Sequence, residues 1–192
     1  MTDLTAKRVL ILGAETEVGR AVTTAVAEAG ASVAAVAATS DAEAAFAVQR
    51  LARRLSSDER KVIAQAIDAT NEAAVRVMVR QVSKELGGLD AIVFTCDLGS
   101  DTEKGFDLAV KNGSREMLRR AGGVIVALDP GIGLPEVAVI PKQTIDELPL
   151  RQPDFVVRVV RDWQTDISHA VEVVLDRMEV DLLSIAGEPH SG

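Results

Sequence analysis

The spacing of apolar residues changes repeatedly along the first half of the chain. Short runs rich in valine, isoleucine and alanine alternate with segments in which apolar residues recur three and four positions apart. The runs are typical of strands buried on both faces of a parallel sheet, and the wider spacing is typical of helices that cover such a sheet. The alternation therefore predicts βαβ units, with strands at Arg8–Leu12, Ser32–Ala37, Val62–Ile67 and Leu89–Thr95.

Residues at the expected helix ends between these strands support the prediction of βαβ units. Gly30 follows the first helical stripe and Gly87 follows the third, where glycine commonly ends a helix. Ser40 and Glu43 have the spacing of a capping box, so we expect Ser40 to begin the second helix. Right-handed crossovers then give a Rossmann-like, doubly wound and mainly parallel sheet between two helical layers. We expect one domain over residues 1–192.

The second half has a less regular pattern. We expect a helix around 106–120 and strands at Val124–Leu128 and Val137–Ile140. Only about eight residues separate these strands, whereas a parallel crossover takes a dozen or more, so this pattern predicts that the fifth crossover helix is deleted. Further along, the apolar spacing predicts helices, or one broken helix, over 155–163 and 170–178, a strand over 180–185 and a frayed tail at 187–192.

Several motifs stand in the order that they take in the short-chain dehydrogenase/reductase family. The turn from Leu12 to Gly19 resembles the family's Thr-Gly-x-x-x-Gly-x-Gly and keeps its first and last glycines, Gly13 and Gly19. Asp68 matches an aspartate after the third strand that, by this resemblance, would meet the adenine of a cofactor. Gly-Gly-Val-Ile-Val at 122–126 resembles the fifth strand. The chain is therefore similar to this family over almost its whole length, with one gap.

The resemblance fails at the residues that would carry out the family's chemistry. Glu17 stands in place of the central glycine, and Asp129 with Pro130 stands where the resemblance implies a catalytic serine. The helix bearing Tyr-x-x-x-Lys would fall in the gap, and the 192 residues contain no tyrosine. The second strand ends in Ala37 and Ala38, without the acidic residue of NAD binders or the basic residue of NADP binders.

These losses predict a pseudo-enzyme that acts as a structural, regulatory or partner-binding subunit. We expect no catalytic residues, no bound cofactor, and association with a second copy or another protein. Gly13, Glu17, Gly19 and Asp68 would form a vestigial cofactor site. In that site Glu15 or Glu17 would replace a phosphate at the helix N-terminus, which attracts anions.

Two alternatives stay open. The chain could be an oxidoreductase that still binds NAD or NADP, with catalysis supplied by Cys96, Asp129 or a partner chain. It could also bind another small molecule at the carboxyl ends of the strands, where such sheets usually hold ligands. An acidic pocket with Glu17, Asp97 and Asp129 would favour neutral or cationic ligands over phosphates.

Composition narrows the range of partners. A net charge of −8 and a pI near 4.8 disfavour nucleic acid, which requires a basic face. The apolar runs are too short to span a bilayer, and the start does not resemble a secretory signal, so we expect a cytoplasmic protein. A single cysteine excludes an internal disulfide.

The remaining reactive side chains have simpler structural interpretations. We expect Cys96 to be a small buried residue, because a neighbouring acid raises rather than lowers the pKa of a thiol. No histidine has a second ligand at metal-like spacing, so we expect no metal site. We also expect surface or core roles for the other candidates, which are Asp101, Lys111, Asn112, Arg151, Arg158, Arg161, Trp163, His169 and His190.

Overall fold

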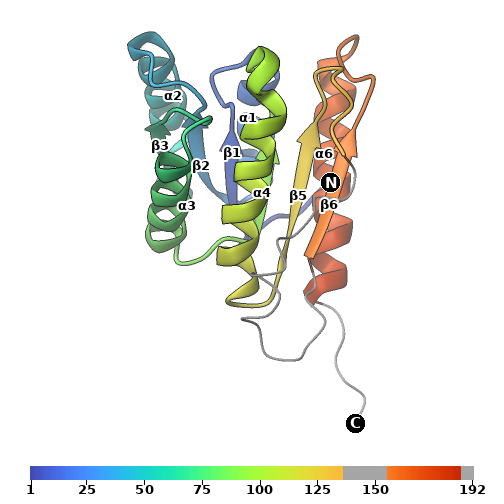
Figure 1. Ribbon diagram of the computed structural model, residues 1–192. Helices are drawn as coiled ribbons and strands as arrows, with labels where there is room; N and C mark the ends of the chain where they lie inside the picture. The colour runs from blue at the N-terminus through green and yellow to red at the C-terminus, as the bar shows by residue number, and fades with distance from the viewer. Residues whose placement is uncertain (136–154, 187–192) are drawn as a thin grey trace.

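A six-stranded parallel sheet forms the centre of the protein (Figure 1). The computed structural model describes residues 1–135 and 155–186. The strand order is β3-β2-β1-β4-β5-β6, and every neighbouring pair is parallel. The strands are β1 (Arg8–Leu12), β2 (Ser32–Ala37), β3 (Val62–Ala66), β4 (Ala91–Phe94), β5 (Gly123–Leu128) and β6 (Phe155–Val160).

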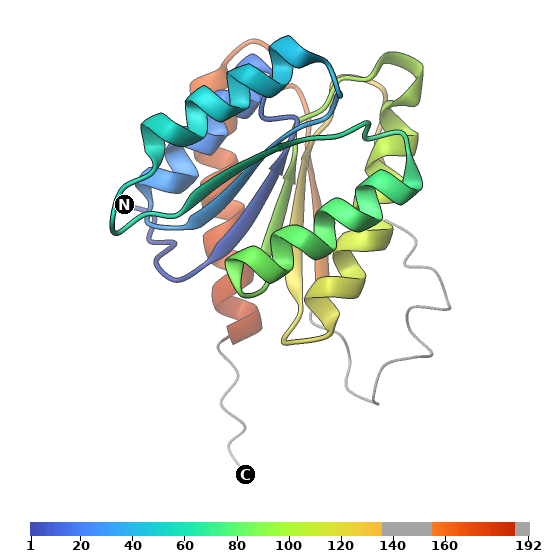
Figure 2. The same cartoon turned by 90° about the vertical axis from the view of Figure 1, so that its left-hand side faces the viewer.

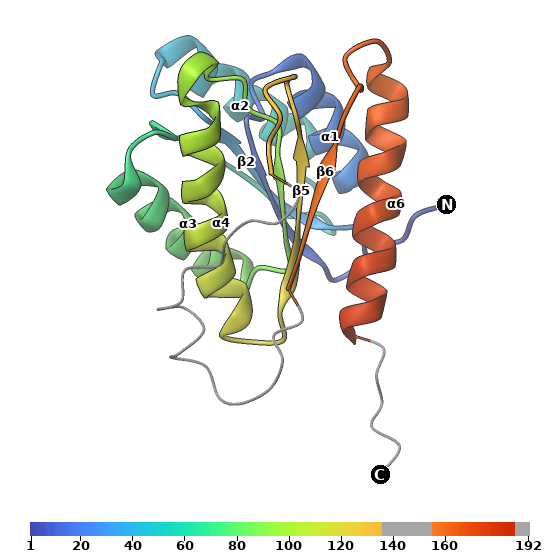
Figure 3. The ribbon, with the colours of Figure 1, turned by 45° about the vertical axis from the view of Figure 1, so that its right-hand side comes forward.

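Helices cover both faces of the sheet. Those of the described part are α1 (Glu17–Glu28), α2 (Ala42–Leu55), α3 (Glu72–Leu86), α4 (Thr102–Leu118) and α6 (Ile167–Ala186), with a short 3-10 turn, η1 (Gly99–Asp101), before α4. Helices α1, α2 and α6 pack on one face, and α3 and α4 pack on the other (Figures 2 and 3). The predicted doubly wound, Rossmann-like three-layer architecture is confirmed.

The buried strand runs explain this layering. Val9 and Ile11 of β1 belong to the core beneath α1 and α6, whereas Leu10 and Leu12 belong to the core beneath α3. All four side chains are 0% exposed, because successive residues of a strand point to opposite faces and both faces are covered. The chain leaves β1 toward β2 and later returns to β4 on the other side. The carboxyl ends of β1 and β4 therefore form the switch point at which such folds hold ligands.

The second helix begins one residue later than the sequence predicted. Asp41, not Ser40, is its N-cap, and the Asp41 carboxylate accepts hydrogen bonds from the backbone N–H groups of Glu43 and Ala44. The capping-box prediction is therefore wrong. An aspartate at the N-cap satisfies the same N–H groups and adds negative charge at the positive end of the helix.

The C-terminal predictions are partly wrong. Residues 155–160 form strand β6 rather than a helix, and 180–185 continue α6 rather than forming a strand. Phe155 and Val157 pack toward the core of α3 and α4, whereas Val156 packs toward α6, which is the alternation of a strand. The Arg158 guanidinium crosses to the Asp181 carboxylate of α6 at 2.9 and 3.0 Å, which fixes the end of that helix against the strand.

The predicted deletion of a crossover helix depended on a strand at Val137–Ile140, which lies outside the described residues. The strand that pairs with β5 is β6, so the connection runs from 129 to 154. That length does not exclude a helix, and the eight-residue argument does not apply to it. No helix within the described residues is long and apolar enough to cross a membrane.

The core beneath α4 gives a stability test. Phe106 is 0% exposed and packs edge-on against Phe94, with ring centroids 5.5 Å apart. We expect Phe106→Ala to lower the free energy of unfolding by about 3 to 5 kcal/mol. Phe46→Ala is the matched control, because Phe46 is 62% exposed and its truncation should cost less than about 0.5 kcal/mol. Urea unfolding measures both, and equal losses would contradict the core placement.

Candidate functional site at the carboxyl edge of the sheet

The turn between β1 and α1 is closely packed at both of its glycines. Gly13 has φ +97°, and a Cβ there would lie 2.8 Å from the Thr95 carbonyl carbon and 2.9 Å from the Cys96 nitrogen. A Cβ on Gly19 would lie 2.0 Å from the Gly13 carbonyl oxygen. Both positions therefore require glycine for backbone packing alone. Their retention does not by itself indicate a ligand.

Thr16 caps the first helix. Its hydroxyl donates to the Gly13 carbonyl at 2.8 Å and accepts from the Gly19 N–H at 2.9 Å. The first N–H groups of a helix have no acceptor inside the helix, and among those of Glu17, Val18 and Gly19 the Thr16 hydroxyl accepts only that of Gly19. The N–H groups of Glu17 and Val18 thus form the anion-attracting end of α1, and the Glu17 side chain is exposed beside them.

Glu15 places a carboxylate at the end of β2. Its Oε2 accepts a hydrogen bond from the Ala38 N–H at 3.1 Å. Burial raises the pKa of this half-buried carboxyl, while backbone hydrogen bonds and the Arg20 charge oppose that rise. Glu15 therefore does not cap α1 as a phosphate substitute, which corrects one of the two expectations for that role. Instead its carboxylate lies directly after β2, where the sequence has no acidic residue.

Asp68 lies in the loop that follows β3, at the same edge. Its Oδ1 accepts hydrogen bonds from the Thr70 N–H at 2.9 Å and the Thr70 hydroxyl at 2.7 Å. The hydroxyl bond is the main cause of a lowered pKa for this exposed carboxylate. The next residue, Ala69, donates its N–H to the Ala38 carbonyl at 3.1 Å, so the loop after β3 meets the end of β2 beside Glu15.

Asp129, at the end of β5, is fully engaged in structural contacts. Its carboxylate accepts four backbone N–H groups at 2.9 to 3.1 Å, from residues 131, 132, 133 and 134. It also accepts the Arg161 guanidinium at 2.7 Å, and its carbonyl oxygen accepts the Trp163 indole N–H at 2.7 Å. Burial alone would raise the pKa, but the four backbone bonds outweigh burial and lower it. Asp129 therefore does not have a lone pair free to act as a general base.

Cys96 is also unsuited to catalysis. The thiol is 1% exposed and donates to the Leu12 carbonyl at 3.3 Å. Burial raises the pKa of the thiol well above its ordinary value, and the Glu15 charge raises it further. Because the thiolate is the nucleophilic form, a raised pKa and burial both disfavour a nucleophilic role for Cys96. The sequence prediction of a small buried residue agrees with this placement.

The other candidates have ordinary structural contacts. Lys111 pairs with Glu72 of α3 at 2.5 Å, and the Asn112 amide donates to the Leu108 carbonyl at 2.8 Å. Asp97 accepts the Gly99 N–H, and His169 lies exposed in the first turn of α6. Within 1–135 and 155–186, no group of three or more metal-ligating side chains comes together. Arg151 and His190 lie outside the described residues.

The fold and this edge define a class, the α/β proteins that hold dinucleotides at the switch point of a doubly wound sheet. Within that class, the sequence pattern of the short chain dehydrogenase family matches residues 7–107. The chain belongs to this family. No curated protein matches it.

Solved structures agree with the assignment. A short-chain type dehydrogenase/reductase from Mycobacterium marinum is 31% identical with a TM-score of 0.60, covering 69% of this chain and 61% of that one. A putative short-chain alcohol dehydrogenase from Sinorhizobium meliloti is 27% identical (TM-score 0.56; 71% and 60% covered). A short chain dehydrogenase from Burkholderia cenocepacia, in complex with NADP, is 29% identical (TM-score 0.53; 65% and 56% covered). The chain thus spans roughly 60% of the length of its relatives.

These similarities correct one expectation. The sequence predicted that no cofactor binds, because the central glycine and the residue after β2 are atypical. The family is one of dehydrogenases, and the Burkholderia relative was solved with NADP bound, so the comparison points to a nucleotide cofactor. The sequence argument considered only the residues at the end of β2, whereas the structure also brings the Glu15 carboxylate to that place.

Asp129 gives a test with a defined pH dependence. We expect Asp129→Asn to lower the free energy of unfolding by about 1 to 3 kcal/mol at pH 7, because an amide nitrogen replaces one acceptor oxygen. The pKa of Asp129 is lowered in the fold, so its stabilising contribution is present above the unfolded pKa of about 4 and is lost as the pH falls through the folded pKa.

Urea unfolding at pH 7 and at successively lower pH checks this expectation. The gap between wild type and Asp129→Asn should narrow as the pH falls below about 4. Asp176→Asn is the control, because Asp176 is an exposed residue of α6 and its loss removes the same charge. A gap that stays constant down to the acid limit would contradict the ionised, hydrogen-bonded state of Asp129.

Proposed function

We propose that this chain binds a nicotinamide dinucleotide at the carboxyl ends of β1 and β2 and acts as an oxidoreductase subunit of the short-chain dehydrogenase type. The observation that carries the proposal is the Glu15 carboxylate, held 3.1 Å from the Ala38 N–H. In dinucleotide-binding folds an acidic side chain at this place accepts hydrogen bonds from the adenosine ribose. Glu15 brings that acid from the β1–α1 turn instead of from the end of β2.

The position of Glu15 also favours one cofactor over the other. NADP carries a 2′-phosphate on the adenosine ribose, and a carboxylate at the same place would repel it. NAD has a hydroxyl there, which can donate a hydrogen bond to Glu15. Burial raises the pKa of Glu15, so its ionised form is less favourable in the unliganded protein than in water, and a ribose hydroxyl would offset part of that difference. We therefore propose selectivity for NAD and NADH.

The pyrophosphate region fits the same cofactor with one opposing feature. The N–H groups of Glu17 and Val18 are available at the start of α1. The Arg20 guanidinium donates to the Glu15 carbonyl at 2.6 Å and brings positive charge to this turn. The Glu17 carboxylate adds like charge to the pyrophosphate and weakens binding. Because it is exposed, the Glu17 side chain can turn toward water, so we expect weakened rather than abolished binding.

The catalytic step requires a proton donor other than the family's tyrosine. The bound nicotinamide ring supplies the hydride donor or acceptor. The 192 residues contain no tyrosine to supply the proton. Asp129 cannot replace a tyrosine because its carboxylate already accepts backbone and Arg161 hydrogen bonds, and Cys96 cannot because it is buried with a raised pKa. This favours a donor outside the described residues or on a partner chain, and with it association with a second copy or another protein. A regulatory subunit that binds NADH without turnover is the second candidate, supported by the same lack of tyrosine.

Calorimetric titration with NAD, NADH, NADP and NADPH tests the cofactor proposal. We expect NADH to bind at least about tenfold more tightly than NADPH, because like charges oppose each other only in the NADPH complex. Glu15→Gln should reduce this ratio to near one. Glu28→Gln, an exposed change at the far end of α1 with the same charge difference, should leave the ratio unchanged. Failure of all four nucleotides to bind would contradict the proposal.

The central position of the turn gives a second test. We expect Glu17→Gly to tighten NADH binding by about three- to tenfold, because it removes a negative charge beside the pyrophosphate. The same titration measures this change, with Glu28→Gln again as control. Weaker or unchanged binding by Glu17→Gly would show that the pyrophosphate does not lie at the N-terminus of α1.

A further inference from the structure

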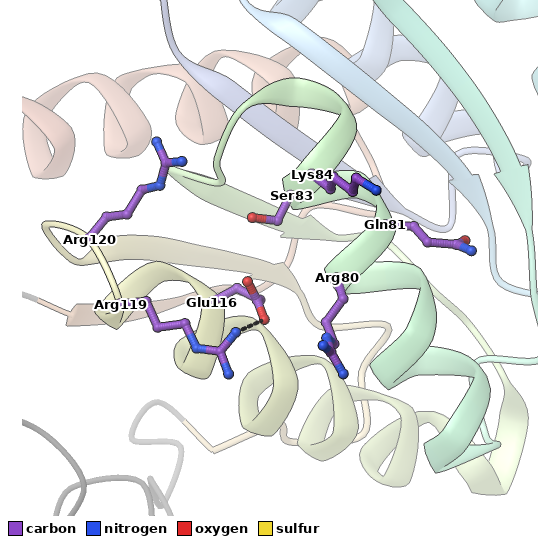
Figure 4. A pocket seen from close by; sticks show the side chains of 7 residues that line it. All are labelled: Arg80, Gln81, Ser83, Lys84, Glu116, Arg119 and Arg120. Carbon is purple, nitrogen blue, oxygen red and sulfur yellow. Dashed lines mark hydrogen bonds and ion pairs between the residues drawn. The ribbon is translucent and has the colours of Figure 1, made fainter.

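A basic groove lies between α3 and α4, at the amino edge of the sheet (Figure 4). It encloses about 470 Å³ and is lined by Arg80, Gln81, Ser83, Lys84, Glu116, Arg119 and Arg120. Helix α3 ends just before β4 and α4 ends just before β5, so the groove lies at the opposite edge of the sheet from Glu15 and the β1–α1 turn. Four cationic side chains thus gather on a chain whose net charge is −8.

The charges in this groove are poorly compensated. Glu116 is the one acid in its lining, and it already pairs with Arg119 at 2.8 Å. In the described part of the chain, Arg80, Lys84 and Arg120 have no carboxylate within ion-pair distance. These three side chains therefore offer their N–H donors to solvent or to an anion.

Helix electrostatics explain only part of this arrangement. Cations in the last turn of a helix complement its negative end, which accounts for Lys84 and Arg119. Arg80 lies well before the end of α3 at Leu86, and Arg76 precedes Arg80 by one further turn on the same face. Arg76 faces Glu72 one turn earlier and Lys84 complements the end of the helix, so Arg80 is the cation of this row that the helix itself does not explain.

Two further arginines, Arg8 and Arg115, lie near the groove, and each has an acidic neighbour. A Cβ on Gly88 would lie 2.4 Å from the Arg8 guanidinium and 3.0 Å from that of Arg120, so two guanidinium groups meet over a residue without a side chain. Asp90 neutralises Arg8. On α4, one turn before Arg119, Arg115 has a buried Nε with no hydrogen-bond partner among the residues that the structure describes. Arg115 does not line the groove, and its charge acts on Glu72 of α3, so it is not counted among the groove's donors.

We infer that this groove binds a small, multiply charged anion, of the di- or triphosphate class, at a site separate from the dinucleotide. Guanidinium groups bind phosphate oxygens with paired N–H donors, and the groove has Arg80 on the wall formed by α3 and Arg119 and Arg120 on the wall formed by the end of α4. The volume suits a small ligand, since such sites commonly measure about 300 to 1,000 Å³. The inference does not depend on the proposed oxidoreductase function.

Calorimetric titration with inorganic pyrophosphate tests the site, using the double variant Arg80→Gln with Arg120→Gln. Glutamine preserves helix propensity while removing the charges. We expect binding by wild type and a loss of at least about tenfold in affinity in the double variant. The matched control is Arg53→Gln with Arg54→Gln, two exposed arginines in the last turn of α2 that change the net charge equally. Its affinity should stay within about twofold of wild type.

Three outcomes would overturn the inference. They are no binding of pyrophosphate by wild type, equal weakening in both double variants, and binding that the groove variant leaves unchanged. Equal weakening would indicate general charge attraction, and unchanged binding would place the anion outside the groove. Repeating the titration with saturating NADH separates the two sites, because a groove at the opposite edge should bind pyrophosphate equally well. Thermal melts of both double variants verify that they are folded.

Discussion

The close approach of Gly19 to the Gly13 carbonyl determines the geometry of the carboxyl edge. With no room for a Cβ at either residue, α1 starts directly above the end of β1, and the turn lies against Thr95 and Cys96 at the end of β4. Thr16 holds this arrangement by bonding to both glycines. The one residue of the turn that then reaches sideways is Glu15, whose carboxylate meets the end of β2. A packing constraint thus places the acid on which the proposed cofactor choice depends.

The described charges differ between the two edges of the sheet. Glu15, Glu17 and Asp68 lie at the carboxyl ends of β1, β2 and β3, whereas Arg80, Lys84 and Arg120 lie at the amino edge beneath α3 and α4. The net charge of −8 does not predict the local electrostatic potential of either edge, because that potential depends on where the charges lie and not only on their sum. This difference is the basis of both proposals: a carboxyl edge that disfavours an additional phosphate on the ribose, and an amino edge that attracts a separate phosphate anion.

The sequence predicted most of the sheet because its signals are local. Runs such as Val9 to Leu12 are apolar throughout, which suits only a strand covered on both faces, and Gly87 ends α3 in the left-handed conformation as expected. The pattern Phe-Val-Val-Arg-Val-Val at β6 fits helical and strand spacing equally well, and pairing with β5 decides between them. The site depended on contacts that sequence order hides. Glu15 meets Ala38 across 23 positions, and the groove combines residues of two separate helices.

Glycine retention and cofactor binding are separable in this chain. In relatives a glycine turn is usually attributed to the approach of a pyrophosphate, but here Gly13 and Gly19 are already required by contacts within the protein. The two glycines are therefore required in this turn whether or not it binds a ligand. Glu15 differs, because burial raises its pKa and makes its ionised form a cost to the fold. The Ala38 N–H and the Arg20 charge offset only part of this cost, and in the proposed complex a ribose hydroxyl would offset more of it.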